Sequence, residues 1–331
     1  MNEEKKVVLE VRNLHKKFSG DAGFFSSRGK YVYAVNNLSF SLYKGETYGL
    51  VGESGCGKTT TARLLVKMYS CDEGKVYFFD GKDRKDIFAL SKKELKNYRQ
   101  KVKYIFQDPA RSLNPRMNIY QILTTGYRHT AKWPGKELAQ KEAAKILEEV
   151  GLSKNDLERH PNEFSGGQRQ RISIARSLIM QPEVLLCDEV VSALDVSIQG
   201  QILNLLQEIK AKRNLSLLFI AHDLKVACYF CDRIGVMYKG VLMEECCAEN
   251  MYKQALHPYT QLLFSGVPQY NKKDSETTLI QESELKRATT ELRGCPFYER
   301  CPKAQEICLK EMPNFVCVDT TTNHKVRCHF V

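Results

Sequence analysis

Apolar and polar positions alternate along the chain in two patterns, one typical of strands and the other of helices. The segments 7–14 and 31–43 are rich in Val, Tyr, Phe and Leu and predict strands. The continuous apolar runs at 184–187 and 215–220 predict strands that are buried on both faces, as in a parallel sheet. Between these runs, residues 197–212 predict a helix. Such alternation of strands and helices indicates an α/β fold with a largely parallel sheet.

A long, mostly helical stretch interrupts the strands in the middle of the chain. Residues 136–150 carry apolar side chains at helical spacing, and Gly151 suits the position just after a helix. The pattern decays after residue 265, where the polar and charged residues 271–290 indicate a linker. A Cys-rich tail follows this linker.

These patterns predict how the chain is organised. We expect a main domain over residues 1–265 that contains an inserted helical subdomain at about 108–180. We expect a C-terminal extension over 266–331, made of the linker at 271–290 and the Cys-rich tail.

The composition predicts a folded protein without a membrane span of its own. The chain has 331 residues, of which 43% are hydrophobic, enough for a sizeable core. No apolar run reaches the roughly 18–20 residues of a membrane helix, and the charged start lacks the apolar segment of a signal peptide. We therefore expect a cytoplasmic protein that serves a membrane only through a partner. The net charge of +11 comes with scattered Lys residues, so we expect no nucleic-acid partner.

A phosphate-binding loop is predicted after the apolar run at 47–51. The sequence GESGCGKT matches G-x-x-x-x-G-K-[ST] between a predicted strand and a predicted helix. Its glycines let backbone N–H groups turn inward around a phosphate, and the start of the helix adds partial positive charge. Lys58 is expected to bridge the β- and γ-phosphates, and the Thr59 hydroxyl to bind Mg²⁺. The predicted nucleotide-binding residues here are Gly52, Ser54, Gly55, Cys56, Gly57, Lys58, Thr59 and Thr60.

Two carboxylates follow the apolar run at 184–187. Asp188 is expected to hold Mg²⁺, directly or through water, and Glu189 to act as general base on the attacking water. An acidic strand end is common on protein surfaces. The pair gains weight because a phosphate loop requires a carboxylate of this kind on a neighbouring strand.

A second potential anion site begins at Ser165. Ser165, Gly166, Gly167 and Gln168 start an Arg-rich helix whose first N–H groups lie at its positive end. The segment FSGGQRQRISIARSLI resembles the signature of the ABC ATPase family, and the resemblance covers about residues 7–265. It implies a P-loop NTPase core of the ABC ATPase type with an antiparallel β subdomain, the inserted helical subdomain and a small Cys-rich extension. In this family, the signature of one subunit closes on the γ-phosphate held by the phosphate loop of its partner.

The resemblance also implies roles for residues outside these motifs, with ATP and Mg²⁺ as ligands. Gln107, in YIFQDP, is similar to the glutamine that senses Mg²⁺ and contacts the membrane subunit. His222, in FIAHDL, is similar to the switch histidine that touches the γ-phosphate. Asp195, in SALD, is similar to the residue of the loop that crosses the dimer interface.

An aromatic side chain that stacks on adenine is expected upstream of the phosphate loop. Phe18, in LHKKFS, matches best, and Tyr31 and Tyr33 are alternatives. The chain departs from the family at Val190, where Pro usually follows the general-base Glu. Because proline restrains the backbone, its loss is expected to loosen the following turn, whereas Glu189 is retained.

Four further segments resemble the oligopeptide and dipeptide importer ATPases: GLVGESGCGKTT, FQDPARSLNPRM, VSALDVSIQGQILNLL and HPYTQLL. The third looks like the second of the two paired ATPases in that group, which implies a heterodimer with a related ATPase subunit. The group also implies two transmembrane permease subunits, an extracellular or periplasmic substrate-binding protein, and a peripheral location on the cytoplasmic face of the membrane. Importers of nickel and glutathione belong to the same group, so these substrates are alternatives.

Cysteines crowd the tail, although the whole chain has only twelve. Such local enrichment in a reducing compartment suggests a metal site. Cys295, Cys301, Cys308 and Cys328 fall where the importer group has its terminal motif, whereas Cys317 is extra. Four thiolates can hold a [4Fe–4S] cluster or Zn²⁺. Because the paired C-x₂₋₄-C spacing of structural zinc is missing, we expect the cluster, with Zn²⁺ or reduced thiols as alternatives.

Two other functions account for parts of the sequence. A soluble ABC ATPase acting on nucleic acid would explain the positive charge, but such proteins usually carry two cassettes or long coiled-coil insertions in one chain. A metal- or redox-sensing regulator would change its ATPase activity with the state of the Cys tail. The main expectation is an ATP-hydrolysing subunit that powers import of oligopeptides or dipeptides through closing and opening of an ATPase dimer.

Overall fold

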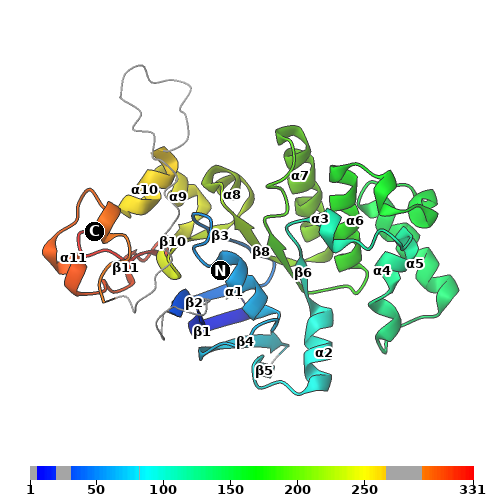
Figure 1. Cartoon of the computed structure of the whole chain (residues 1–331), viewed down its shortest axis with the longest axis horizontal. Helices are drawn as coiled ribbons and strands as arrows, with labels where there is room; N and C mark the ends of the chain where they lie inside the picture. The colour runs from blue at the N-terminus through cyan, green and yellow to red at the C-terminus, as the bar shows by residue number, and fades with distance from the viewer. Residues whose placement is uncertain (1–5, 20–30, 82, 266–292) are drawn as a thin grey trace, which may run out of the picture. The chain divides into compact units, whose positions relative to one another are not determined.

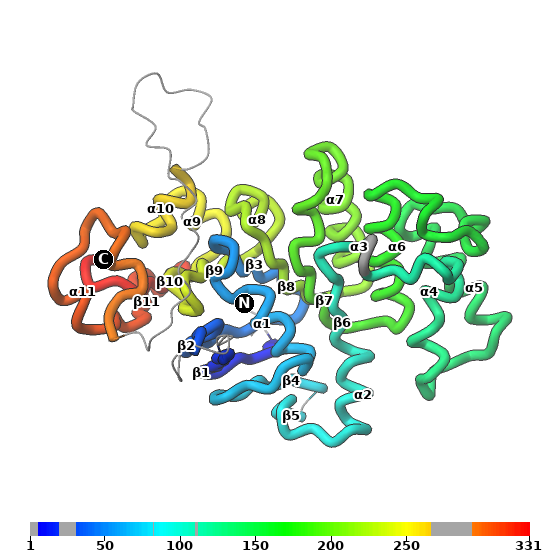
Figure 2. Tube along the Cα trace, viewed as in Figure 1, coloured from blue at the N-terminus to red at the C-terminus, as the bar shows by residue number. Residues whose placement is uncertain are grey.

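The computed structural model describes residues 6–19, 31–81, 83–265 and 293–331 (Figures 1 and 2). The predicted linker at 271–290 lies outside these ranges. The chain divides into two compact units. The first unit comprises Met1–Lys6, Tyr43–Glu46 and Leu90–Ile220, and the second comprises Val7–Leu42, Thr47–Ala89 and Ala221–Val331.

The first unit has a parallel sheet as its core. Strand β7 (Val184–Asp188) lies between β6 (Val102–Ile105) and β8 (Ser216–Ala221), and it pairs with both in parallel. All residues of β7 and β8 are buried, as expected from their continuous apolar runs. The helices of this unit are α2 (Lys92–Lys101), α3 (Pro109–Ser112), α4 (Ile119–Thr124), η1 (Tyr127–His129), α5 (Lys136–Glu149), η2 (Lys154–Glu158), η3 (Pro161–Glu163), α6 (Gly166–Leu178) and α7 (Val196–Arg213).

Helix α6 organises the helical part of the first unit. It packs against α3, α4 and α5 on the helical side and against β6 and α7 on the sheet side. Arg171 donates from Nη1 to the Val150 carbonyl (2.7 Å), so it satisfies a backbone group at the end of α5. Arg213, at the end of α7, donates two hydrogen bonds to the buried Glu149 carboxylate, at 2.8 and 2.5 Å. These contacts hold α5, α6 and α7 together.

The second unit contains two groups of strands. The first group is a sheet in the order β2 (Tyr31–Tyr43), β1 (Val7–Ser19), β4 (Glu73–Asp80) and β5 (Asp83–Asp86), in which β1–β4 and β4–β5 are antiparallel. The other runs in the order β11 (Val316–Asp319), β12 (His324–Val326), β10 (Val241–Cys247), β9 (Arg233–Tyr238) and β3 (Thr47–Val51). Its helices are α1 (Lys58–Leu65), α8 (Leu224–Phe230), α9 (Ala248–Lys253), α10 (Pro258–Ser265), η4 (Tyr298–Arg300) and α11 (Glu306–Lys310).

The Cys-rich tail is part of this second group of strands. Strand β12 pairs antiparallel with β10, and β11 pairs with β12 in turn. The carboxylate of Glu244, fully buried in β10, accepts hydrogen bonds from the backbone N–H groups of Leu256 (2.8 Å) and His257 (2.9 Å). It also lies 2.7 Å from the ring Nε2 of His324 in β12. One buried acid therefore connects β10, the start of α10 and the tail.

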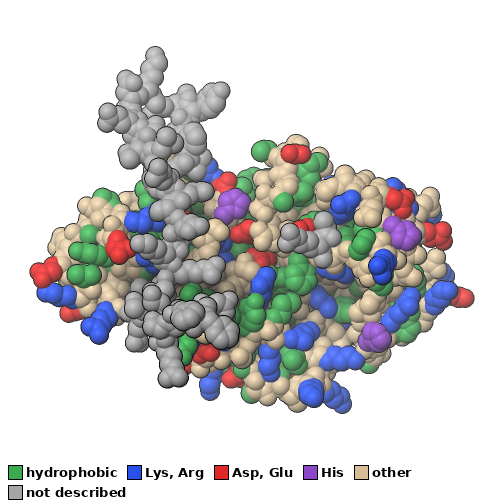
Figure 3. All heavy atoms as spheres, in the orientation of Figure 1, with side chains coloured by type: hydrophobic (Ala, Val, Ile, Leu, Met, Phe, Trp, Pro, Cys, Tyr) green, Lys and Arg blue, Asp and Glu red, His purple; other side chains and the backbone are tan. Residues whose placement is uncertain are grey.

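The distribution of surface charge and the length of the helices bear on whether the chain binds nucleic acid or spans a membrane. Lys and Arg side chains of the described residues are dispersed over the face drawn in Figure 3, with Asp and Glu side chains among them. Within the described ranges, none of the helices combines the length and the apolar character that a membrane span needs.

Candidate nucleotide-binding site

The predicted phosphate loop connects the fully buried strand β3 to helix α1 in the second unit. Gly57 has φ +111°, and a Cβ there would lie 2.0 Å from the Ala34 carbonyl oxygen. A Cβ at Gly52 would lie 2.1 Å from the Met237 carbonyl oxygen. Only glycine fits at either position, because a side chain would displace the neighbouring backbone. Neighbouring chain segments therefore impose the shape of the loop.

Lys58 occupies the inside of this loop. Its side chain is buried, and its Nζ donates to the carbonyl oxygens of Gly52 (2.7 Å) and Glu53 (3.0 Å). Ser54 and Gly55 are exposed at the crown of the loop, whereas Thr59 and Thr60 are half-buried in the first turn of α1. The loop thus surrounds the ammonium group. Its exposed residues Ser54 and Gly55 leave the loop open to an anion from solvent.

Cys56 has a structural place in the loop. Its side chain is buried, and burial raises the pKa of its thiol. A thiol of this kind stays protonated and unreactive at neutral pH. Cys56 therefore fills space beneath the loop.

The predicted carboxylates lie at the carboxyl end of β7 in the first unit. Asp188 is buried, and its Oδ2 accepts a hydrogen bond from the hydroxyl of Tyr104 in β6. Glu189 accepts a hydrogen bond at Oε2 from Gln107 Nε2 (2.7 Å). The structure therefore brings Gln107, Asp188 and Glu189 to one sheet edge. The sequence did not predict a role for Tyr104, because a tyrosine in a strand gives no indication of which carboxylate its hydroxyl will contact.

Glu189 has an uncommon backbone conformation. Its φ is +48°, in the left-handed region that non-glycine residues rarely adopt. Its N–H donates to the Ile220 carbonyl (3.0 Å), and its own carbonyl accepts from the Ser192 N–H (3.2 Å) and hydroxyl (2.9 Å). Val190, which stands where the family usually has Pro, is 2% exposed. Hydrogen bonds and burial thus support the turn at Val190, and the expected loosening stays a prediction.

Ser165 caps helix α6 as the sequence indicates. Its Oγ accepts from the Gln168 N–H (3.3 Å), and the Gln168 side chain accepts from the Ser165 N–H (3.0 Å). Ser165, Gly166 and Gln168 are exposed, and Gly167 is half-buried against Ile198. This reciprocal cap presents the positive end of a long helix to solvent.

Asp195 lies just before helix α7, in the same unit as Ser165. Asp195 is exposed, and the next residue, Val196, is 85% exposed. Both residues are therefore open to solvent at the start of α7.

The remaining predicted residues lie in the second unit. His222 is exposed in the turn before α8, where Asp223 caps the helix by accepting from Lys225 N–H (2.8 Å). Phe18, near the end of β1, is half-buried and lies edge-on to Tyr69 with ring centroids 5.4 Å apart. Tyr31 is more exposed, at 44%, with the Lys17 ammonium 5.0 Å from its ring.

A small cavity in the tail brings the four predicted cysteines together. Cys295, Cys301, Cys308 and Cys328 all line it, beside His257. Burial, with smaller contributions from the other three thiols, raises the pKa of Cys295 to about 11. Within the described residues, no three His, Cys, Asp or Glu side chains are arranged as a site for a metal ion. The exposed Cys317 does not line this cavity.

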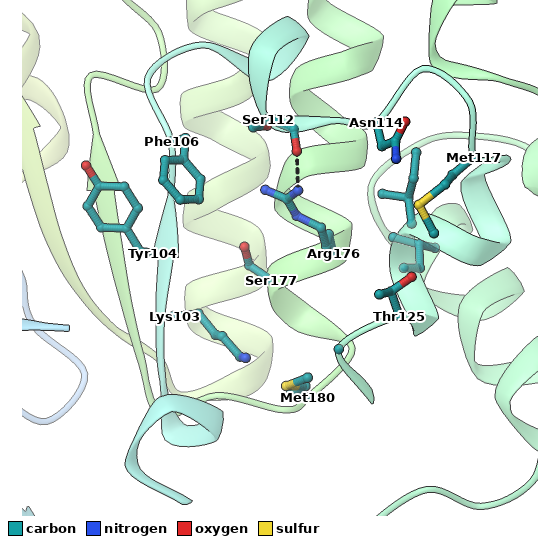
Figure 4. Close-up of a pocket in the computed structure, with 13 residues that line it drawn as sticks. Lys103, Tyr104, Phe106, Ser112, Asn114, Met117, Thr125, Arg176, Ser177 and Met180 are labelled. Carbon is teal, nitrogen blue, oxygen red and sulfur yellow. Dashed lines mark hydrogen bonds between the residues drawn. The ribbon is translucent and has the colours of Figure 1, made fainter. Parts of the chain in front are cut away.

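A second cavity lies in the first unit, beside the strand that leads to Gln107 (Figure 4). Tyr104 and Phe106 line one side, and Met117 lies on the opposite side among residues of α4 and the loop before it. Arg176 of α6 donates to the Ser112 carbonyl (2.6 Å) between them. Burial and the nearby Arg176 lower the pKa of Lys103 to about 8. The cavity is therefore apolar with two half-buried cations in its wall.

Comparison with known proteins decides the family. Residues 35–192 match the family described as "ABC transporter", and residues 243–308 match "Oligopeptide/dipeptide transporter, C-terminal region". The chain is 42% identical over 326 residues to the oligopeptide transport ATP-binding protein AppF of Bacillus subtilis, covering 98% of this chain and 97% of that protein. The chain belongs to the oligopeptide transport ATP-binding family of ABC proteins. It is also 41% identical over 333 residues to OppF of Haemophilus influenzae, covering 99% and 98% of the two chains.

Solved structures of ABC cassettes share the fold of this family member. A dimeric post-hydrolysis structure of the ATP-binding cassette MJ0796, bound to ADP and Pi, is 26% identical with a TM-score of 0.63. It covers 72% of this chain and 98% of that chain. The ADP conformation of the cassette MJ1267 is 25% identical with a TM-score of 0.63, covering 79% and 99%. The predicted family and the predicted α/β fold of the ABC ATPase type are both confirmed.

Proposed function

We propose that this chain binds and hydrolyses ATP to power the import of oligopeptides or dipeptides through a membrane channel that partner permease subunits form. The observation that carries the ATPase part is the loop 52–59, which glycines shape around the buried Lys58 ammonium. The transport part is supported by relatives named for oligopeptide transport that match this chain over nearly their whole lengths. The chain then works at the cytoplasmic face of the membrane as a peripheral subunit.

The chain's own residues divide the work on ATP. Lys58 leaves the two loop carbonyls that hold it and reaches the β- and γ-phosphates, while His222 contacts the γ-phosphate. Thr59, Gln107 and Asp188 would hold Mg²⁺, which would neutralise charge on the phosphates. Glu189 accepts a proton from the attacking water.

The other predicted residues contact the partner subunit or the adenine ring of ATP. Ser165, Gly166, Gly167 and Gln168 present the α6 terminus to the γ-phosphate held by a related partner ATPase, and Asp195 lies at the dimer interface. Phe18 stacks on adenine. The proposed ATPase domain spans residues 1–265, with a helical subdomain at about 108–180 and an extension over 266–331.

The cavity beside Gln107 is the proposed contact with the permease. A cytoplasmic helix of a permease subunit that carries an apolar face and a carboxylate fits its apolar wall and the cations Lys103 and Arg176. Through this contact, movement around Gln107 passes to the channel. A substrate-binding protein outside the membrane delivers the peptide.

The four thiols of the tail cavity are the proposed ligands of a [4Fe–4S] cluster. Their support is the shared cavity and the effect of neighbouring thiols, which together with burial raises the pKa values of Cys295 and Cys301. The tail sequence lacks the paired C-x₂₋₄-C spacing that is typical of structural Zn²⁺ sites, and four thiolates are the usual ligand set of a [4Fe–4S] cluster.

The proposal is tested by nucleotide binding and by uptake. Lys58→Ala is expected to abolish Mg-ATP binding by the purified chain, measured by titration calorimetry. Glu189→Gln is expected to keep binding and lose at least about 10²-fold in hydrolysis, as general-base removal does. Cells that carry Glu189→Gln should take up labelled di- and tetrapeptides poorly. Unchanged peptide uptake, with nickel or glutathione uptake lost instead, would reassign the substrate.

A further inference from the structure

Glu53, the second residue of the phosphate loop, is held at three points. Its N–H donates to the Tyr259 hydroxyl (2.9 Å), and its carbonyl accepts from Lys58 Nζ (3.0 Å). Its carboxylate accepts two hydrogen bonds from the Arg300 guanidinium, at 2.8 and 2.9 Å. Tyr259 lies 206 positions and Arg300 247 positions further along the chain. The C-terminal part of the chain thus supports the outside of the loop.

The turn that carries Arg300 runs between two of the cavity thiols. The Tyr298 N–H donates to the Cys295 carbonyl (3.1 Å), and the Cys301 N–H donates to the Tyr298 carbonyl (3.2 Å). Arg300 itself donates from its N–H to the Phe297 carbonyl (3.0 Å). The position of the guanidinium therefore depends on how Cys295 and Cys301 are held.

Aromatic packing connects this turn to the loop a second time. Phe297 is 1% exposed, and its ring centroid lies 5.4 Å from that of Tyr238 and 5.3 Å from that of Tyr259. Tyr259 is the residue whose hydroxyl holds the Glu53 N–H. The turn and the loop consequently share one buried cluster, so a shift of the turn reaches Glu53 by two routes.

We propose that Arg300 is a positioning residue of the phosphate loop, and that it transmits the state of the four tail thiols to the affinity of the loop for ATP. The inference rests on the proposed function, because it takes the loop to be the ATP site. When the thiols share a ligand, both ends of the turn are fixed and the guanidinium stays opposite Glu53. When they do not, the turn gains freedom, and the Glu53 carbonyl that orients Lys58 moves with it.

The first test measures the dissociation constant of Mg-ATP for the full chain. Arg300→Gln is expected to weaken binding about tenfold, because a charge-assisted, two-bond contact is lost. Glu299→Gln is the matched control: this neighbour on the same turn is 81% exposed and pairs only loosely with Lys239, at 3.8 Å. Glu53→Gln and the double variant should resemble Arg300→Gln, since one interaction is removed in all three. Hydrogen exchange of the loop amides should rise in parallel with the loss of affinity.

The second test changes the thiols without touching the turn. Cys328→Ser removes one cavity thiol and is expected to weaken ATP binding as Arg300→Gln does, whereas the exposed Cys317→Ser is not. Cys328→Ser combined with Arg300→Gln should be no weaker than Arg300→Gln alone. All variants are compared after anaerobic purification.

Two results would overturn the inference. If Arg300→Gln leaves ATP affinity and loop exchange unchanged, Arg300 does not position the loop. If Cys328→Ser binds ATP like the unaltered chain, the thiols do not act on the loop. Failure of the proposed function is recognised separately, since Lys58→Ala would then bind ATP normally while loop exchange still reports the Arg300–Glu53 contact.

Discussion

The phosphate loop and the turn at 295–301 obtain their shapes in opposite ways. Backbone conformations that only glycine adopts without strain shape the loop, so consecutive residues encode it. The turn is anchored by the buried ring of Phe297 and has contacts to residues far away in the sequence. The comparison teaches that neighbouring residues can determine the shape of a site, while contacts with residues far away in the sequence hold it in position. Four predictions test how far these two properties can be separated.

The largest effect is expected from removing the anchor of the turn. Phe297→Ala should lower the free energy of unfolding by about 3–5 kcal/mol, because a buried aromatic ring leaves a cavity among Tyr238, Tyr259 and His257. Urea denaturation of the full chain measures this loss. Phe330→Ala is the control, because Phe330 is 39% exposed and its loss should cost far less. Equal losses in both variants would contradict the role of Phe297 as anchor.

The loop should be almost as sensitive at Gly57. Gly57→Ala is expected to cost about 3 kcal/mol and to abolish ATP binding, because the new Cβ meets the Ala34 carbonyl in a left-handed conformation. Gly55→Ala shares the positive φ, but a Cβ there meets open space. It should cost only about 1 kcal/mol. Urea denaturation and calorimetry separate the two, and identical behaviour would show that steric contact with neighbouring backbone does not shape the loop.

The aromatic cluster beside the turn should make stability depend on pH. Burial lowers the pKa of His257 to about 4, against an opposing effect of the Glu244 carboxylate. The unfolded chain therefore takes up this proton at a higher pH than the folded chain does. The contribution to stability is complete above about pH 6.5 and is lost as pH falls toward 4, by about 3 kcal/mol in total.

Two variants check this assignment by urea denaturation between pH 7 and 4. His257→Asn keeps an acceptor for the Tyr259 N–H, which His257 Nδ1 accepts at 3.0 Å, and should flatten the pH dependence. His160→Asn, at an exposed position, should leave it unchanged. A slope that persists in His257→Asn would assign the lost stability to other groups.

The smallest effect is expected at the cap of helix α6. Ser165→Ala should cost about 1 kcal/mol of stability through loss of its hydrogen bond to the Gln168 N–H. Ser153→Ala, which removes a similar cap from η2, should cost a comparable amount. ATP hydrolysis distinguishes them, because only Ser165→Ala should reduce it. Equal activity in both variants would remove Ser165 from the proposed site.

The sequence predicted well where a short segment decides its own structure. The runs at 184–187 and 215–220 became buried strands, because continuous apolar residues suit a sheet covered on both faces. The predicted helix at 197–212 is α7, and Ser165 caps α6 as its spacing with Gln168 indicates. The spacing of the glycines was also sufficient to predict the phosphate loop.

Contacts between distant segments could not be predicted in the same way. Tyr104 meets Asp188, and Arg300 meets Glu53, because strand pairing and aromatic packing bring them together. The short strands β11 and β12 were not predicted either, since the pairing of β12 with β10 and of β11 with β12, rather than local propensity, makes them strands. The roles of Phe18 and His222 toward ATP stay predictions.

The pairing of β12 with β10 also has a consequence for how the protein stays in solution. The backbone of β12 satisfies part of the edge of β10, whose residues Val241–Cys246 are all buried. Removing the last residues of the chain would leave that edge with unpaired backbone hydrogen-bonding groups, to which strands of other molecules can pair. A chain shortened before His324 is therefore expected to form aggregates during expression, whether or not it retains its thiols. The tail is thus expected to prevent aggregation as well as to stabilise the fold.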